Sequence, residues 1–193
     1  MVSWEREPLE ETELAELLDA ADEFDSKHSL VIYTLAYTGM RASELAHMTR
    51  DWIHFQDGEI RIPPEETCDR GCCSDDDGVW TPKTAEGARR IPLRDERTRQ
   101  LLRWWFAESD TLGMSRMTLY RRVRDVAAET GITKKVTPHV LRHTFGTRLA
   151  AQDFTASAIQ SAMGHADLET SQKYIKFSGR RLHEEFDEKW RSV

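Results

Sequence analysis

The sequence lacks long apolar runs, an even set of cysteines and any excess of glycine or proline. No stretch approaches the roughly 18 apolar residues of a membrane span, and no charged-then-apolar leader follows Met1. The three cysteines lie within six residues, which is not the framework of a secreted disulfide protein. Six prolines and ten glycines in 193 residues exclude a fibrous or low-complexity chain. We therefore expect a cytoplasmic globular protein with no membrane partner and enough length for one well-buried domain.

Acidic residues outnumber basic ones and give a net charge of −7, but the excess is concentrated in two segments. Residues 1–26 hold ten acids and one base, and residues 65–77 hold six acids and one base. The rest of the sequence holds 25 basic and 18 acidic residues, so the negative net charge is compatible with a basic surface for nucleic acid. Arginines number 20 against 7 lysines, a bias that suits bidentate binding of phosphate. The same bias, with so many acids, also fits a protein from a salt-adapted organism.

Apolar periodicity predicts a mostly helical α+β fold with a small antiparallel β-sheet. Helices are expected at residues 10–24, 29–37, 42–48, 95–107, 115–130, 138–152, 155–163 and 168–176. Strands are expected at residues 52–55, 59–63, 78–81 and 89–93, with an Asp-Gly turn between the first two. All of residues 1–193 are expected to form a single domain, in which 63–78 is a cysteine-containing insertion in a hairpin. Residues 179–193 are expected to form a tail helix with Leu182, Phe186 and Trp190 on one face.

Two arginines follow sequence signals for the start of a helix. Arg41 comes after Gly39 in the segment TGMRASEL, and Glu44 lies three residues later on the same face. Arg142 lies in TPHVLRHTFGT, where a proline fits the first helical position and His139 shares a face with Arg142. Free helix N–H groups and guanidinium groups suit an anion such as phosphate. Taken alone, Arg41 and Glu44 are better explained as a surface ion pair at a helix end, and the spacing of His139 and Arg142 is weak evidence for a site.

Further candidates lie outside these two segments. Lys83 occurs in WTPKT beside an expected strand, where a solvated lysine at a hairpin tip is the simpler interpretation. His165 occurs in MGH, and Tyr174 follows nine residues later. A tyrosine hydroxyl can attack a phosphodiester when nearby cations lower the cost of its charge, although most tyrosines only pack. His143, one residue after Arg142, is expected to be a buried packing residue.

The segments TGMRASEL, TPK, TPHVLRHTFGT and MGH, followed by Tyr174, occur in the order seen in the tyrosine recombinases of the phage integrase family. The resemblance covers residues 10–180 and implies the catalytic domain of an enzyme that cuts and rejoins DNA through a 3′-phosphotyrosyl intermediate. It implies that Arg41 and Arg142 hold the scissile phosphate. It also implies that His139 and His165 hydrogen-bond this phosphate or move protons.

The remaining roles follow from the same resemblance. Lys83 would protonate the leaving 5′-oxygen, Tyr174 would be the nucleophile, and Glu44 would orient Arg41 or a neighbouring histidine. The chemistry is reasonable because two guanidinium groups neutralise the equatorial oxygens of a phosphodiester. Covalent storage on tyrosine keeps the bond energy for religation, and nothing in the sequence resembles a carboxylate cage for Mg²⁺. We therefore expect no cofactor.

The expected partners are double-stranded DNA and other recombinase subunits, as a tetramer on DNA and a monomer or weak dimer when free. Candidate DNA-contacting residues are basic side chains on the hairpin and on the helix at 115–130, where a helix can enter the major groove: Arg89, Arg90, Arg121, Arg122 and Arg124. The N-terminal core-binding domain of many relatives is expected to be absent from this chain. The tail helix could pack on its own domain or on a neighbouring subunit.

Two other functional classes stay open at this point. A topoisomerase of type IB uses similar chemistry to relax DNA, and a non-catalytic DNA-binding regulator could keep the fold without the reaction. The ordered motif set favours the recombinase, and the filled catalytic positions argue against a regulator.

The cysteines Cys68, Cys72 and Cys73 are a weak candidate for a metal site. Zinc takes four ligands, and the fourth would be His54, an aspartate or a group from a second chain. A single C-x₃-C-C pattern is common without a metal, so the sequence favours free cysteines in a mobile loop and no metal.

Overall fold

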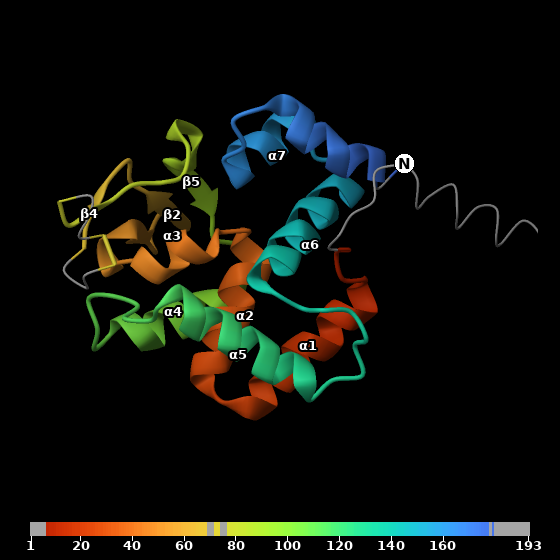
Figure 1. Cartoon of the computed structure of the whole chain (residues 1–193), viewed down its shortest axis with the longest axis horizontal. Helices are drawn as coiled ribbons and strands as arrows, with labels where there is room; N and C mark the ends of the chain where they lie inside the picture. Colours follow the sequence, from red (N-terminus) through yellow and green to blue (C-terminus); the bar gives the residue numbers. More distant parts are fainter. Residues whose placement is uncertain (1–6, 69–71, 74–76, 178, 180–193) are drawn as a thin grey trace, which may run out of the picture.

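The structure is a computed structural model that describes residues 7–68, 72–73, 77–177 and 179 (Figure 1). Its helices are α1 (Glu11–Phe24), α2 (Ser26–Thr38), α3 (Ala42–His47), α4 (Glu96–Phe106), α5 (Arg116–Ala128), α6 (Pro138–Ala151), α7 (Ala156–Met163) and a helix over residues 168–177. Its strands are β1 (Ile53–His54), β2 (Glu59–Ile62), β3 (Glu66–Thr67), β4 (Val79–Trp80) and β5 (Arg89–Pro92). This confirms the predicted mostly helical α+β fold. Leu182, Phe186 and Trp190 of the expected tail helix lie outside the described residues.

Capping side chains and a glycine set the bounds of the central helix α2. Asp25 accepts hydrogen bonds from the backbone N–H groups of Lys27 and His28, so α2 begins at Ser26, before the apolar run from which it was predicted. Gly39 ends the helix with a φ of 60°, where an added Cβ would collide with a neighbouring aromatic ring. Because α2 contacts α1, α4, α5 and α6, it forms the centre of the helical part of the fold.

The strands form two small antiparallel sheets. The three-stranded sheet has the order β1-β2-β5, and its register pairs Ile60 with both Ile53 and Ile91, which places three buried side chains on one face. β3 and β4 pair separately as a two-stranded hairpin. β3 lies within the insertion predicted for residues 63–78, where the two residues Glu66 and Thr67 offer no apolar alternation that could signal a strand.

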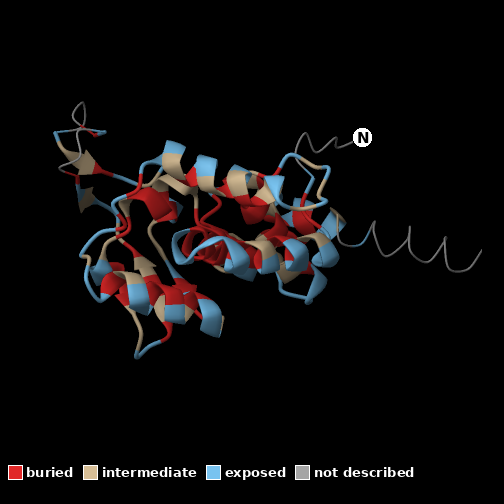
Figure 2. Ribbon diagram, turned by 90° about the horizontal axis from the view of Figure 1, so that it is seen from below, coloured by how far each residue is buried: buried red, intermediate tan, exposed pale blue. Residues whose placement is uncertain are grey.

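The apolar side chains gather in two clusters of unequal size. The larger cluster joins α1 to α6 with the sheets. Figure 2 colours the buried residues red, and they lie along the parts of the helices that pack against other elements. The smaller cluster consists of Ala150, Ile159, Met163 and Tyr174, which lie on α6, α7 and the helix over 168–177. Because this smaller cluster has only four buried apolar residues in the described part of the chain, the segment that carries Tyr174 is expected to open at a lower cost in free energy than the rest of the fold. Within the described residues, no helix combines the length and apolar character needed to cross a bilayer.

Candidate active site

Arg41 and Arg142, the two predicted phosphate ligands, converge on one turn of the chain. Arg41 lies at the N-cap of α3 and donates from Nη2 to the carbonyl of Gly164 at 2.8 Å. Arg142, on α6, donates from Nη2 to the carbonyl of Met163 at 2.5 Å and from Nη1 to the carbonyl of Gly39 at 2.5 Å. Met163 and Gly164 end α7, where the last carbonyls have no partner within the helix and attract cations. The guanidinium groups are thereby held side by side.

A buried carboxylate, Glu44, lies between Arg41 and a third arginine. Its oxygens accept hydrogen bonds from Arg41 Nη1 at 2.8 Å and from Arg89 Nη1 and Nη2 at 3.0 Å each. The backbone N–H of Arg41 also donates to Glu44, at 2.7 Å. Burial raises the pKa of Glu44, but the neighbouring charges and hydrogen bonds of Arg89, Arg142 and Arg41 outweigh it and hold the pKa below its usual value. Glu44 is therefore ionised, and it positions the arginines.

The positive charge at this point exceeds the charge of Glu44, because three guanidinium groups gather around one carboxylate. Burial, with the charges of Arg41 and Arg89, lowers the pKa of Arg142 to about 9, although Glu44 raises it. An anion placed beside Arg41 and Arg142 would relieve this repulsion. Each Nη carries two hydrogens, so the bonds to carbonyl groups fix the guanidinium planes and leave N–H donors for such an anion.

A chain of hydrogen bonds links Tyr174 to two histidines of α6. The Tyr174 hydroxyl lies 2.8 Å from His143 Nδ1, and His143 Nε2 lies 2.7 Å from His139 Nε2. One consistent assignment has the tyrosine donating to Nδ1 of His143, which in turn donates from Nε2 to His139. His143 therefore takes part in the site, although the sequence analysis expected only a packing role. Its spacing of four residues from His139 on one helix was the available signal.

Tyr174 itself is almost completely buried, with 2% of its surface exposed. Burial raises the pKa of its hydroxyl to about 12, although the charges of Arg142 and Arg41 lower it. Its ring packs so closely on α6 that a Cβ added to Gly146 would lie 2.7 Å from Tyr174 Cε1 and 2.6 Å from Met163 Sδ. A residue without a side chain at position 146 is thus needed to hold the tyrosine where it is.

His165 stacks on the Tyr174 ring, with ring centroids 5.8 Å apart and planes at 2° to each other. Burial and the charges of Arg142, Arg41 and Arg89 lower the pKa of His165 to about 3, so the ring is neutral at neutral pH. Its Nδ1 lies 2.9 Å from the buried hydroxyl of Ser171. If Ser171 donates to Nδ1, the Nε2 of His165 carries the hydrogen and can donate it to a ligand.

A groove of 1050 Å³ runs past the arginines, and it contains four of the six predicted catalytic residues together with part of α5. The predicted residues that line it are Arg41, Lys83, His139 and Arg142. Tyr174 and His165, which are both buried, are not among the residues that line it. Lys83 is exposed in the segment between β4 and β5. Arg116 and Tyr120 of α5 face the same groove.

The arginines predicted to contact DNA lie in different surroundings. The side chain of Arg89 is only 5% exposed and binds Glu44 and the carbonyl of Ala162, so the structure places it in the interior. Nothing in its sequence context signalled burial. Arg122 is partly buried and reaches His28 on α2, on the side of α5 away from the groove. Arg90, Arg121 and Arg124 are exposed. Arg124 shares a helix face with Arg116 and Tyr120, whereas Arg121 lies about 100° around the helix from Tyr120.

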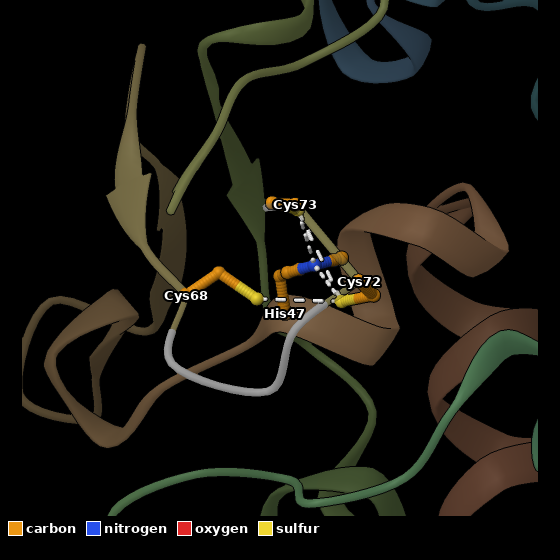
Figure 3. A group of neighbouring side chains, drawn as sticks. All are labelled: His47, Cys68, Cys72 and Cys73. Carbon is orange, nitrogen blue, oxygen red and sulfur yellow. Dashed lines mark hydrogen bonds between the residues drawn. The ribbon is translucent and has the colours of Figure 1, made fainter. Parts of the chain in front are cut away.

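The three cysteines lie together where the β3–β4 hairpin meets α3 (Figure 3), and Cys72 and Cys73 line the groove. Cys68 and Cys73 are buried and Cys72 is exposed. The histidine beside them is His47 of α3 rather than His54, which the sequence analysis had named as a fourth ligand. His47 lies 21 or more positions before the cysteines in the sequence, so the C-x₃-C-C pattern could not reveal that it joins them.

Residues 7–180 match the model of the phage integrase family. The chain belongs to this family. It is 29% identical to tyrosine recombinase XerD of Haemophilus ducreyi over 186 residues, which cover 92% of this chain and 61% of the relative. It is 27% identical to XerD of Pseudomonas putida over 179 residues, covering 91% of this chain and 59% of the relative.

Solved structures agree with this family membership. The crystal structure of XerA recombinase matches with a TM-score of 0.74 at 26% identity, over 97% of this chain and 65% of that one. The Tn1549 transposon integrase, in complex with transposon right end DNA, matches with a TM-score of 0.71 at 23% identity, over 96% of this chain and 68% of that one, and shows a shared fold. This phage integrase family chain spans about three fifths of the length of the two XerD relatives. The predicted fold and family are confirmed.

Proposed function

We propose that this phage integrase family chain cleaves and rejoins DNA strands through a 3′-phosphotyrosyl link to Tyr174. The convergence of Arg41 and Arg142 on the adjacent carbonyls of Met163 and Gly164 carries this proposal, because it places two guanidinium groups where one phosphate can bind both. The names of its relatives, which are tyrosine recombinases, support the same reaction class.

In the proposed cleavage step, the Tyr174 oxygen forms a bond to phosphorus while the bond from phosphorus to the 5′-oxygen breaks. The phenolic proton passes to Nδ1 of His143, which lies 2.8 Å from the hydroxyl, and His139 can take a proton from His143 in turn. A base is needed because burial raises the pKa of Tyr174 to about 12. The departing 5′-oxygen takes a proton from the ammonium group of Lys83. Attack by a 5′-hydroxyl reverses the sequence and rejoins the strand.

The other residues of the site stabilise the transition state. Arg41 and Arg142 donate to the equatorial oxygens of the phosphate, and removal of one such donor typically costs on the order of 100- to 1000-fold in rate. His165, neutral and oriented by Ser171, donates a further hydrogen bond from Nε2. Glu44 and Arg89 do not touch the phosphate, and they act by positioning Arg41 and the end of α7. This assigns Arg89 a positioning role in place of the predicted DNA contact.

Double-stranded DNA is the proposed occupant of the groove between Lys83 and α5. The groove presents Arg116 and Tyr120 beside the catalytic arginines, and Tyr120 is 41% exposed. Arginine side chains bind phosphates, and an exposed tyrosine can donate to them as well. A tetramer of subunits on DNA remains the expectation from the sequence.

The experiment that tests this function uses a pool of duplexes with randomised sequence around a nick that traps any cleaved strand. The wild-type chain is expected to form an adduct that survives denaturation, and Tyr174→Phe is expected to form none. Tyr37→Phe is the matched control, because it removes a hydroxyl from a tyrosine of α2 that stacks on Tyr33. If wild type and Tyr174→Phe both fail to form an adduct at several salt concentrations, a DNA-binding protein without cleavage activity becomes the better account.

A further inference from the structure

Three sulfur atoms and one imidazole nitrogen face a common centre beside the active-site groove (Figure 3). The cluster consists of Cys68, Cys72 and Cys73 from the β3–β4 hairpin and His47 from the last turn of α3. The ligand atoms all lie within 4.8 Å of one another. Thiolate and imidazole ligands in a set of four are the usual donors of a structural zinc site.

Four of the six separations between ligand atoms in this cluster are close to those of a tetrahedron around one ion. With Zn–S and Zn–N bonds of about 2.3 and 2.0 Å, tetrahedral angles place two sulfurs about 3.8 Å apart and a sulfur and a nitrogen about 3.5 Å apart. The Sγ atom of Cys72 lies 3.3 Å from Sγ of Cys68 and 4.0 Å from Sγ of Cys73. His47 Nε2 lies 3.4 Å from Cys72 Sγ and 3.5 Å from Cys73 Sγ. The sulfurs are also well beyond the length of about 2.05 Å that a disulfide requires.

The imidazole of His47 is oriented as a metal ligand would be. Its Nδ1 lies 2.7 Å from the carbonyl of Ser43, one turn earlier in α3, so Nδ1 carries the hydrogen. The lone pair of Nε2 therefore points toward the cysteines. The ring also stacks on Trp80 of β4, with centroids 5.1 Å apart and planes at 14°. A backbone carbonyl that fixes the tautomer in this way is a regular feature of zinc-bound histidines.

We propose that Cys68, Cys72, Cys73 and His47 bind one structural Zn²⁺ ion that fastens the β3–β4 hairpin to α3. The soft, sulfur-rich donor set selects zinc over Mg²⁺ or Ca²⁺, which prefer oxygen ligands. Four protein ligands complete the tetrahedron and leave no position for a substrate, so the ion has a structural role.

The hairpin needs such a fastening because its own structure is slight. β3 and β4 contribute two residues each and are separate from the three-stranded sheet. A lone two-stranded hairpin is at best marginally stable in water. β4 leads directly to Lys83, and α3 begins beside Arg41, so the ion would tie the lysine segment to the helix of the phosphate-binding arginine. Three of the four ligands line the same groove as Lys83 and Arg41.

The test measures bound metal directly and does not depend on DNA cleavage, so it can fail without affecting the proposed recombinase function. The full chain, purified without a metal-binding tag and under reducing conditions, is expected to contain about one zinc ion per chain by mass spectrometry. Cys73→Ser and His47→Gln are expected to lose most of this zinc. His54→Gln is the matched control, because it changes a histidine outside the cluster, and it is expected to retain the zinc.

Cobalt substitution keeps the proposal testable if a variant fails to fold. The wild-type chain, stripped of metal and titrated with Co²⁺, is expected to show the intense absorption of a tetrahedral site and a sulfur-to-cobalt charge-transfer band, with saturation at one equivalent. A chain that takes up neither zinc nor cobalt would overturn the proposal. So would the weak spectrum of octahedral cobalt, full zinc retention in both Cys73→Ser and His47→Gln, or a disulfide within the cluster under reducing conditions.

Discussion

Replacing the buried Glu44 with glutamine should destabilise the fold as well as the reaction. The substitution keeps the shape of the side chain but removes the charge that holds Arg41 and Arg89. Breaking a buried ion pair by removing one partner costs about 3–5 kcal/mol, because the other charge stays buried. Glutamine retains one acceptor oxygen, so we expect a loss of about 3 kcal/mol in the free energy of unfolding. For a chain of this length that corresponds to a fall in Tm of roughly 6–12 °C.

The assay is reversible denaturant or thermal unfolding of wild type and Glu44→Gln at neutral pH. Glu59→Gln is the matched control, since Glu59 pairs with the partly exposed Arg61, and solvent screens a surface pair so that its loss has a small effect on stability. A double-mutant cycle with Arg89→Gln supplies the sharper test. The double variant should lose less free energy than the two single variants together, because it leaves no unpaired Arg89 charge. Strict additivity, or equal effects of Glu44→Gln and Glu59→Gln, would refute the reasoning.

Three further predictions concern neighbouring parts of the site. His165 stays neutral in the folded chain down to a pH of about 3 while the unfolded chain protonates it near 6.5, so stability should fall as pH drops through this window. In His165→Gln the slope against pH should be shallower, by at most about 1.4 kcal/mol per pH unit, and identical slopes in urea titrations would contradict this. Gly146→Ala should crowd the ring of Tyr174 and cost about 1–3 kcal/mol in unfolding experiments, and an unchanged stability would show that the ring moves freely. Arg116→Ala should weaken DNA binding and lower its dependence on salt, whereas Arg122→Ala should change neither, and equal effects in titrations at several salt concentrations would count against the groove as the DNA site.

Short, ordered motifs predicted the fold and family well because each combines a structural signal with a chemical one. In TPHVLRHTFGT the proline marks the first turn of α6, and the spacing of His139 and Arg142 places both on the groove. In TGMRASEL the left-handed Gly39 ends α2 and leaves Arg41 at the start of α3. These signals are local, so a single sequence carries them in full.

The roles that were not predicted depend on contacts between distant segments. Arg89 looked like a surface residue of a hairpin, and its burial depends on Glu44, 45 residues away. The sequence analysis named His54, an aspartate or a second chain as the source of a fourth ligand for the cysteines, whereas His47 lies beside them because the hairpin folds back onto α3. His143 was visible as a histidine four residues from His139, but its role depends on where Tyr174 docks. No local pattern reports which segments pack together.

The central claim is most directly tested by identifying the atom that becomes linked to DNA. The trapped adduct of the wild-type chain would be digested with protease and nuclease, and the modified peptide sequenced by tandem mass spectrometry. The account predicts a nucleotide attached through its 3′-phosphate to Tyr174. A 5′-linked nucleotide, or attachment to a different residue while Tyr174 remains unmodified, would contradict it.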